Sequence, residues 1–160
     1  MFFSMIDRIV SYEKGKRITA MKTLSLCEEY LADHFPSFPI MPGVLMLEAM
    51  AEAGAWLLRL SEGFSHSVFL LREVRAVRYG SVVTPGDELW LEVAIVDRSA
   101  DGVAFRGSGK VSGRNAVVGR FVLTRQPLRE LSPQLNKVDE EISRFFEERL
   151  ASLMECERKI

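Results

Sequence analysis

The sequence predicts an α+β domain in which a curled antiparallel sheet of about six strands wraps around one central helix. The first observation is a segment of helical length, residues 43–60, that is apolar on nearly every side. The second is a set of short segments on both sides of it, in which apolar and polar residues alternate as they do in half-buried strands. A helix of this kind must be covered, and one long sheet curled around it does so.

The chain opens with two predicted strands, residues 6–13 and 17–26, joined by a turn around Gly15. A loop over residues 33–43 follows. It holds three prolines, each of which fixes a backbone φ angle and removes an amide donor. We therefore expect a stiff connection into the central helix.

The helix over residues 43–60 consists mainly of good helix formers, and Pro42 suits the position before its first turn. Glu48 and Glu52 are the only charged residues in it before Arg59. They stand four residues apart and therefore share one face. A carboxylate on a buried helix is costly unless it has a partner, so these two residues call for an explanation.

After the helix the alternating pattern returns in four segments separated by glycine-containing turns. These predicted strands cover residues 67–79, 88–97, 103–111 and 116–124. From residue 137 to residue 159, apolar residues recur at helical spacing, which predicts an amphipathic C-terminal helix. We therefore divide the chain into a domain at residues 1–126 and a helical extension at residues 127–160.

The composition, 48% hydrophobic and 27% charged over 160 residues, is that of one ordinary globular domain. A formal net charge of −1 gives no general field that would attract nucleic acid. Cys27 and Cys156 are far apart, which supports neither a disulfide framework nor a metal site. No apolar run reaches membrane-spanning length, so we expect a cytoplasmic protein without membrane insertion and without a metal or redox cofactor.

The segment HFPSFPIMPGVLMLEAMA, which starts at His34, resembles the active-site loop and central helix of β-hydroxyacyl-acyl carrier protein dehydratases. In that family a histidine opens an HFPG-x-P-x-x-PG motif and an acidic residue follows on the helix. His34 and Glu48 stand at the same separation of fourteen residues. Further similar segments extend the resemblance over roughly residues 2–125, namely residues 6–10, 15–18 and 83–89.

The resemblance implies a hot-dog fold and dehydration of β-hydroxyacyl thioesters to trans-2-enoyl thioesters, in fatty-acid or related lipid synthesis. It also implies a homodimer or a trimer of dimers, in which the histidine of one protomer meets the carboxylate of the other. The reaction needs a base at the α-hydrogen and an acid at the β-hydroxyl, so His34 is expected to be the base and Glu48 the acid. The free amide of Gly43 at the helix start is suited to stabilise charge on the thioester oxygen.

The substrate is expected on a phosphopantetheine arm, attached to an acyl carrier protein or to coenzyme A. Its phosphate and an acidic carrier would need local positive charge. Arginines recur at close spacing on one predicted strand, so carrier or phosphopantetheine contacts are expected from Arg72, Arg75 and Arg78.

Three residues depart from the family pattern near the site. Asp33 and Ser37 replace glycines, and Glu52 replaces a glutamine. Asp33 would favour a charged His34, Ser37 lacks the freedom of glycine at positive φ, and Glu52 adds a negative charge beside Glu48. Two alternatives therefore stay open: a hot-dog acyl-thioesterase, and an acyl-binding or scaffold subunit with weakened catalysis.

Overall fold

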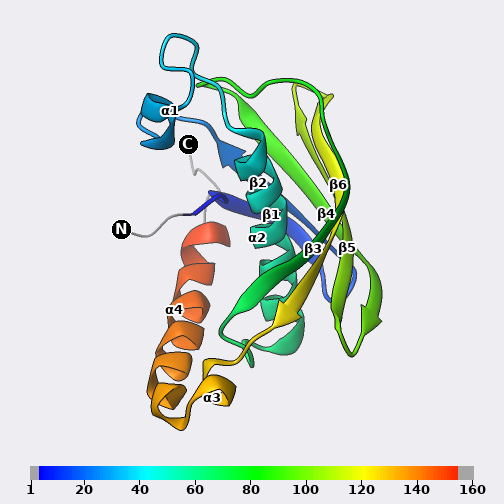
Figure 1. Cartoon of the computed structure of the whole chain (residues 1–160), viewed down its shortest axis with the longest axis vertical. Helices are drawn as coiled ribbons and strands as arrows, with labels where there is room; N and C mark the ends of the chain where they lie inside the picture. Colours follow the sequence, from blue (N-terminus) through cyan, green and yellow to red (C-terminus); the bar gives the residue numbers. More distant parts are fainter. Residues whose placement is uncertain (1–3, 155–160) are drawn as a thin grey trace.

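The computed structural model describes residues 4–154 and contains one six-stranded sheet around one long helix (Figure 1). The elements in chain order are β1 Arg8–Glu13, β2 Arg17–Thr23, α1 Tyr30–Asp33, α2 Gly43–Glu62, β3 Phe69–Tyr79, β4 Glu88–Ser99, β5 Gly102–Val111, β6 Arg114–Arg125, α3 Leu128–Leu131, the 3₁₀ turn η1 Pro133–Leu135 and α4 Asn136–Met154. All strand pairs are antiparallel, in the order β1-β2-β4-β5-β6-β3. The edges of the sheet are therefore β1 and β3.

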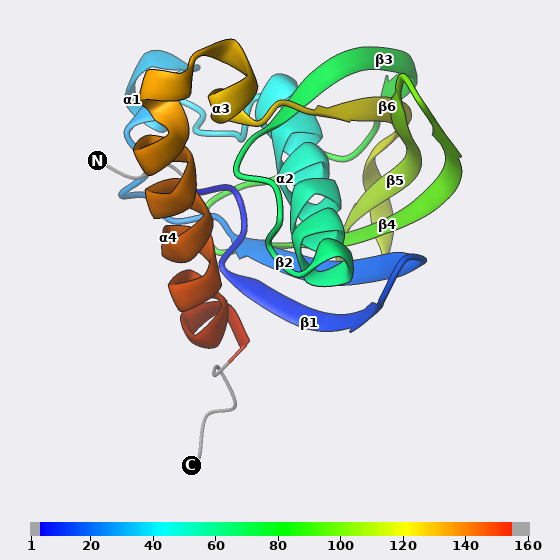
Figure 2. The same ribbon diagram turned by 90° about the horizontal axis from the view of Figure 1, so that it is seen from below.

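The sheet curves around α2, and α4 lies on the side of α2 that the sheet leaves open (Figure 2). This arrangement is the hot-dog fold, as predicted. The alternation read in the sequence is visible on β4, where Leu89, Leu91 and Val93 are buried while Trp90 and Glu92 between them are exposed. Apolar side chains thus face α2 and polar ones face outward.

Two glycines let α2 pack closely on the sheet. A Cβ atom at Gly54 of α2 would lie 3.2 Å from the side chains of Phe121 and Leu123, and one at Gly107 of β5 would lie 2.7 Å from the Met50 sulfur. Larger residues at either position would push the helix away from the sheet. The face of α2 that carries Met50 and Gly54 is therefore fixed against β5 and β6.

The C-terminal extension is held by a buried carboxylate. Asp139 near the start of α4 accepts hydrogen bonds from the Ser67 hydroxyl and from the Leu128 amide, the latter at 2.8 Å. Arg129 lies 3.8 Å away. At the other end of α4, Leu153 is buried in the core. The helix expected at residues 137–159 is confirmed as far as Met154, and residues 155–160 lie outside the described residues.

The sequence did not predict the three short helical elements α1, α3 and η1. The second strand was expected to reach residue 26, but β2 ends at Thr23. From Leu24 onward the chain bonds to the turn before β4 instead, since the Leu24 amide donates to the Asp87 carbonyl and the Gly86 amide donates to the Leu24 carbonyl. None of the helices within residues 4–154 is both long and apolar enough to cross a membrane.

Candidate active site

The face of α2 that turns away from β5 carries Glu48, Glu52 and Arg59. At 3.6 residues per turn these positions point roughly opposite to Met50, which contacts the sheet. They line a pocket of about 350 Å³ between α2, the edge strand β3 and α4. Its remaining lining is apolar and comes from four elements: Ala51, Ala55, Phe69, Leu70, Leu71, Leu123 and Phe146.

Glu48 lies at the open end of this pocket, where its side chain is exposed. Partial burial of the carboxyl group against the apolar walls raises the pKa of Glu48, and the negative charge of Glu52 raises it further. Both effects favour the protonated form. Glu48 is therefore suited to donate a proton to a group bound in the pocket.

Glu52 has a structural role that the sequence did not reveal. One of its carboxylate oxygens accepts a hydrogen bond from the Ser4 hydroxyl at 2.8 Å, and the other accepts one from the Met5 amide at 2.6 Å. Met5 is itself fully buried. The carboxylate at the position where the family has glutamine thus fastens the N-terminal segment to α2, one turn from Glu48.

His34 lies outside the pocket of its own chain. It follows the last residue of α1, is half-buried, and meets the ring of Phe35 edge-on at a centroid distance of 4.6 Å. The pocket that Glu48 lines includes no atom of His34. A single chain therefore does not bring the two sequence-predicted catalytic residues together in this pocket.

The two departures beside His34 are both exposed. Asp33 ends α1, and Ser37 lies in a turn that the Phe38 amide closes on the Phe35 carbonyl at 2.8 Å. We expected serine at position 37 to be strained, because it lacks the freedom of glycine at positive φ. This expectation is wrong. Phe35, with a φ of 48°, is the left-handed residue of this loop, so serine at position 37 carries no such strain.

Gly43 is the first residue of α2, as the motif required. The first helical hydrogen bonds run from the Leu45 and Met46 amides to the Pro42 carbonyl, so the amides before them point outward from the helix start. A Cβ atom at Gly43 would lie 3.0–3.2 Å from the ring of Tyr79. The glycine is needed there because Tyr79, which the sequence analysis did not single out, packs against the helix start.

The three arginines of β3 do not form one group. Arg72 donates to the Asp101 carbonyl at 2.7 Å, and Arg75 lies 2.5 Å from the Glu73 carboxylate. Both line a hollow on the outer side of the sheet, whereas Arg78 is next to Tyr79 at the strand end nearest Gly43. Two bulges in β3 break the alternation on which the sequence grouping relied.

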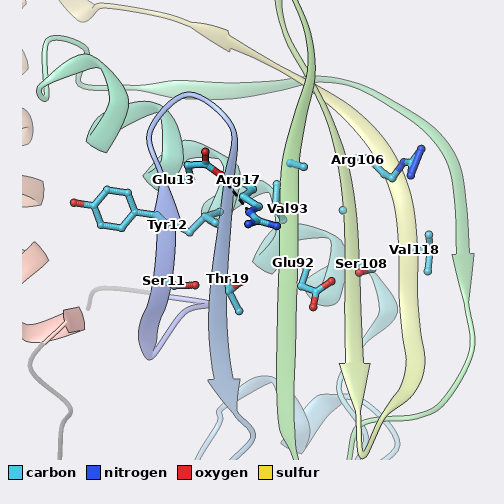
Figure 3. A pocket seen from close by; sticks show the side chains of 13 residues that line it. Ser11, Tyr12, Glu13, Arg17, Thr19, Glu92, Val93, Arg106, Ser108 and Val118 are labelled. Atoms are coloured by element: carbon cyan, nitrogen blue, oxygen red, sulfur yellow. Dashed lines mark ion pairs between the residues drawn. The ribbon is translucent and has the colours of Figure 1, made fainter.

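A further hollow of about 730 Å³ also lies on the outer face of the sheet. Figure 3 shows that polar side chains, including Thr19, Glu92 and Ser108, project into it from the strands. Neither His34 nor Glu48 lines it. The candidate site is therefore the smaller pocket between α2, β3 and α4, which Glu48 lines.

The fold and the pocket define a hot-dog protein with a carboxyl group of raised pKa at the open end of an apolar pocket. The chain also matches the model of the FabA-like domain over residues 1–120. It belongs to that family.

Two proteins of similar sequence are named as dehydratases. The chain is 37% identical over 133 residues to the 3-hydroxyacyl-[acyl-carrier-protein] dehydratase FabZ of Janthinobacterium sp. (strain Marseille), covering 81% of this chain and 85% of the relative. It is 41% identical to the FabZ of Variovorax paradoxus (strain S110), covering 71% and 78%. Among solved structures, the dehydratase heterocomplex ApeI:P from Xenorhabdus doucetiae superposes with a TM-score of 0.66 at 20% identity, covering 82% of this chain and 89% of that one. This last likeness supports the fold.

Proposed function

We propose that this protein is a hydro-lyase that removes water from 3-hydroxyacyl thioesters bound to acyl carrier protein, giving trans-2-enoyl thioesters in fatty-acid synthesis. The observation that carries the proposal is Glu48, a carboxyl group with a raised pKa at the open end of an apolar pocket. The relatives named as FabZ dehydratases, at 37% and 41% identity over most of the chain, support the same reaction.

In the proposed reaction, His34 takes the α-hydrogen of the substrate as a proton. The electron pair of the broken C–H bond forms the new double bond, and the bond from the β-carbon to its hydroxyl oxygen breaks. Glu48 donates its proton to that oxygen, which leaves as water. The Gly43 amide donates to the thioester oxygen as negative charge develops on it.

Each site would use two protomers, because His34 lies outside the pocket that Glu48 lines in its own chain. The edge strand β3 offers the surface for this pairing. It is eleven residues long, and its Leu70, Leu71 and Val74 are exposed although apolar. A long apolar edge strand is a template for pairing with another strand. We infer a homodimer, or a trimer of dimers, in which β3 meets β3 of a second copy.

The carrier would approach at the end of α2 that begins with Gly43, since the thioester must lie between Gly43 and Glu48. Of the three arginines expected to meet the phosphopantetheine arm, Arg78 is nearest to this end. Arg72 and Arg75 already have acidic neighbours on the outer side of the sheet. We therefore propose Arg78 as the phosphate contact, whether the carrier is a protein or coenzyme A, and a cytoplasmic location for the enzyme.

The raised pKa of Glu48 also separates this function from the thioesterase alternative. A thioesterase of this fold would need an ionised carboxylate to activate water, whereas burial and Glu52 both favour the neutral acid. A binding or scaffold subunit would not need the proton at all. A raised pKa of Glu48 therefore favours dehydration, which uses a protonated carboxyl group.

The test is enoyl formation from 3-hydroxyacyl thioesters of acyl carrier protein and of coenzyme A. His34→Ala and Glu48→Gln should each reduce turnover by a factor of about 10² to 10⁴. Glu148→Gln, on the exposed side of α4, is the matched control and should behave as wild type. Wild type that forms no enoyl product from any substrate, with free thiol released or not, would rule out the proposal.

The shared site has its own experiment. Inactive His34→Ala and Glu48→Gln chains are mixed in equal amounts after mild dissociation. If each site takes one residue from each protomer, half of the random dimers have one intact site, and about a quarter of wild-type activity returns. A mixture that stays as inactive as its components would contradict the shared site. It would not bear on the dehydratase function, which the measurement of enoyl formation tests.

A further inference from the structure

The closed end of the Glu48 pocket carries a buried cation. Arg59, in the last two turns of α2, is 6% exposed and lines the pocket. Its Nη2 donates to the Ser67 carbonyl at 3.1 Å, while its buried Nε has no hydrogen-bond acceptor within the described residues. Among the ion pairs found within residues 4–154 there is none for Arg59. A buried charge without a carboxylate partner is expensive, so its presence calls for a reason.

Aromatic rings surround this guanidinium group. Its central carbon lies 3.7 Å from the ring centroid of Phe146, 5.0 Å from that of Phe69 and 5.7 Å from that of Trp56. Ring faces stabilise a cation but accept no strong hydrogen bond, so donors of the guanidinium group stay available. Burial lowers the pKa of Arg59 to about 10, and the charge of Glu52 opposes this shift, so the group is charged at neutral pH.

Arg59 and Glu48 lie at opposite ends of the same groove on α2. They are eleven residues apart on one helix face, about 16 Å along the axis at 1.5 Å per residue. The lining between them includes Ala55, Leu71 and Leu123, whose side chains are apolar. Long helical side chains lean toward the N-terminus, which brings the guanidinium group somewhat closer to Glu48. An extended acyl chain advances about 1.25 Å per carbon, so about ten to twelve carbons cover this distance.

We propose that Arg59 is the distal part of the substrate site and binds acyl chains that carry a hydrogen-bond acceptor at the end remote from the thioester, such as a carbonyl or a carboxylate. This inference rests on the proposed acyl-thioester function and adds the class of acyl chain. The acceptor receives hydrogen bonds from guanidinium donors that the protein leaves available. The apolar side chains of Ala55, Leu71 and Leu123 cover the methylene groups. Glu52 also lies between Glu48 and Arg59, and its carboxylate accepts hydrogen bonds from Ser4 and Met5.

A saturated chain would fit this end of the pocket poorly. Its terminal methyl group would remove solvent from the guanidinium group and return no hydrogen bond, which is unfavourable for a buried donor. The opposite holds for an acceptor, since a hydrogen bond to a charged group is among the stronger ones. We therefore expect a preference of about tenfold or more for the acceptor-ended chain.

Arg59 also fastens α4 to α2 through Phe146, and that contact alone is a structural role. It explains the stacking of the ring on the guanidinium group, but it does not explain why a cation is used. A methionine or leucine side chain would pack against Phe146, Phe69 and Trp56 without burying an unpaired charge. The test must therefore separate packing from recognition of the chain end.

The experiment measures binding rather than turnover. The probes are saturated acyl-pantetheine thioesters of six, eight, ten and twelve carbons, ending in a methyl group, a methyl ester or a carboxylate. Isothermal titration gives their affinities for the wild-type protein. We expect acceptor-ended probes of at least one length to bind about tenfold more tightly than the methyl-ended probe of matched size. Equal affinities for all three ends at every length would overturn the inference.

Arg59→Met keeps a long side chain against Phe146 and Trp56 but removes every donor. It should abolish the preference and leave the methyl-ended probe bound as well as before or better. Arg144→Met, an exposed arginine of α4, is the matched control and should keep the preference. A preference that survives in Arg59→Met would also overturn the inference. If this variant does not fold, the wild-type comparison decides alone.

A four-carbon 3-hydroxyacyl thioester keeps this test apart from that of the proposed function, because it is too short to reach Arg59. Dehydration of this substrate with no preference among the longer probes would contradict the Arg59 inference and support the dehydratase function. A clear preference among the probes, without dehydration of any substrate, would support the Arg59 site and remove the dehydratase function.

Discussion

The guanidinium carbon of Arg59 lies 3.7 Å from the ring centroid of Phe146, and this contact joins the central helix of the hot-dog domain to the C-terminal helix α4. The same ring meets Trp56 edge-on at 5.5 Å and forms part of the wall of the Glu48 pocket. The family model matches residues 1–120, so α4 lies outside the matched segment. We propose that residues 1–126 form the catalytic domain and that residues 127–160 form an extension that closes its pocket.

Phe146→Ala should therefore change both stability and specificity. Loss of the cation–π contact and of part of an aromatic core contact should lower the free energy of unfolding by about 1–3 kcal/mol. The opened pocket should accept longer acyl chains. Thermal unfolding and turnover across a chain-length series measure the two effects. Phe145→Ala, a more exposed neighbour on α4, is the control, and an equal effect of both changes would contradict a specific role for Phe146.

Asp139→Asn should weaken the attachment of α4. Burial opposes ionisation of this carboxyl group, but hydrogen bonds from Ser67 and Leu128 and the charge of Arg129 together lower the pKa of Asp139. Because the folded-state pKa lies below the unfolded one, the stabilisation is complete above pH 4 and is lost as the pH falls through the folded-state pKa. We expect the variant to lose about 1–3 kcal/mol at neutral pH.

The check for Asp139 is the dependence of the melting temperature on pH. Wild type should lose stability as the pH falls below about 4, and the difference between wild type and Asp139→Asn should shrink as it does so. A difference that stays constant with pH would mean that packing, and not the charge of Asp139, holds α4.

Much of the fold was predictable because its signals are local. The apolar helix, the alternating strands and the glycine turns each depend on neighbouring residues, and the HFP motif ties His34 to Glu48 by spacing. The strand bounds were less predictable. The end of β2 is set by hydrogen bonds from Leu24 to the turn at Asp87, more than sixty residues away in the sequence.

The site was predictable only in part, because several of its contacts join segments that are far apart in the sequence. Alternation grouped Arg72, Arg75 and Arg78, but a bulge in β3 between Arg75 and Arg78 sets Arg78 apart from the other two. The roles of Tyr79 against Gly43 and of Phe146 against Arg59 depend on contacts between distant segments. One signal was available, since Arg59 follows six uncharged residues, 53–58, on a predicted buried helix. A buried charge of that kind is a reason to look for a ligand.

The pH dependence of turnover should reflect Glu48. If its protonated form is the acid, activity falls as the pH rises through its raised pKa. Glu52→Gln removes the neighbouring negative charge, so the alkaline limit should move to lower pH. Rates measured from pH 5 to pH 9 with a saturating substrate test this shift. An unchanged or higher limit in Glu52→Gln would contradict the coupling between the two carboxyl groups.

The raised pKa of Glu48 also affects the stability of the fold. A folded-state pKa above the unfolded one means that the protonated carboxyl group stabilises the fold at low pH and that this contribution is lost as the pH rises through the folded-state pKa. At neutral pH, Glu48→Gln should therefore melt slightly above wild type, by about 1–2 °C, since its partial exposure weakens the effect. At pH 4 the two proteins should melt together. A variant that melts below wild type at neutral pH would show that Glu48 contributes to stability through some other contact.

Gly43 at the start of α2 lies close to the ring of Tyr79. A methyl group at position 43 would lie 3.0–3.2 Å from the tyrosine ring, so Gly43→Ala should displace either Tyr79 or the first turn of α2. We expect turnover to fall by about tenfold or more, because in the proposed mechanism the amide at position 43 donates to the thioester oxygen and would no longer be aimed at it. Combining Gly43→Ala with Tyr79→Ala removes the ring from the methyl group and should restore most of the lost activity. Steady-state rates of the two single variants and the double variant measure this rescue. If the double variant is no more active than Gly43→Ala, the new methyl group acts by obstructing the substrate and not by displacing Tyr79.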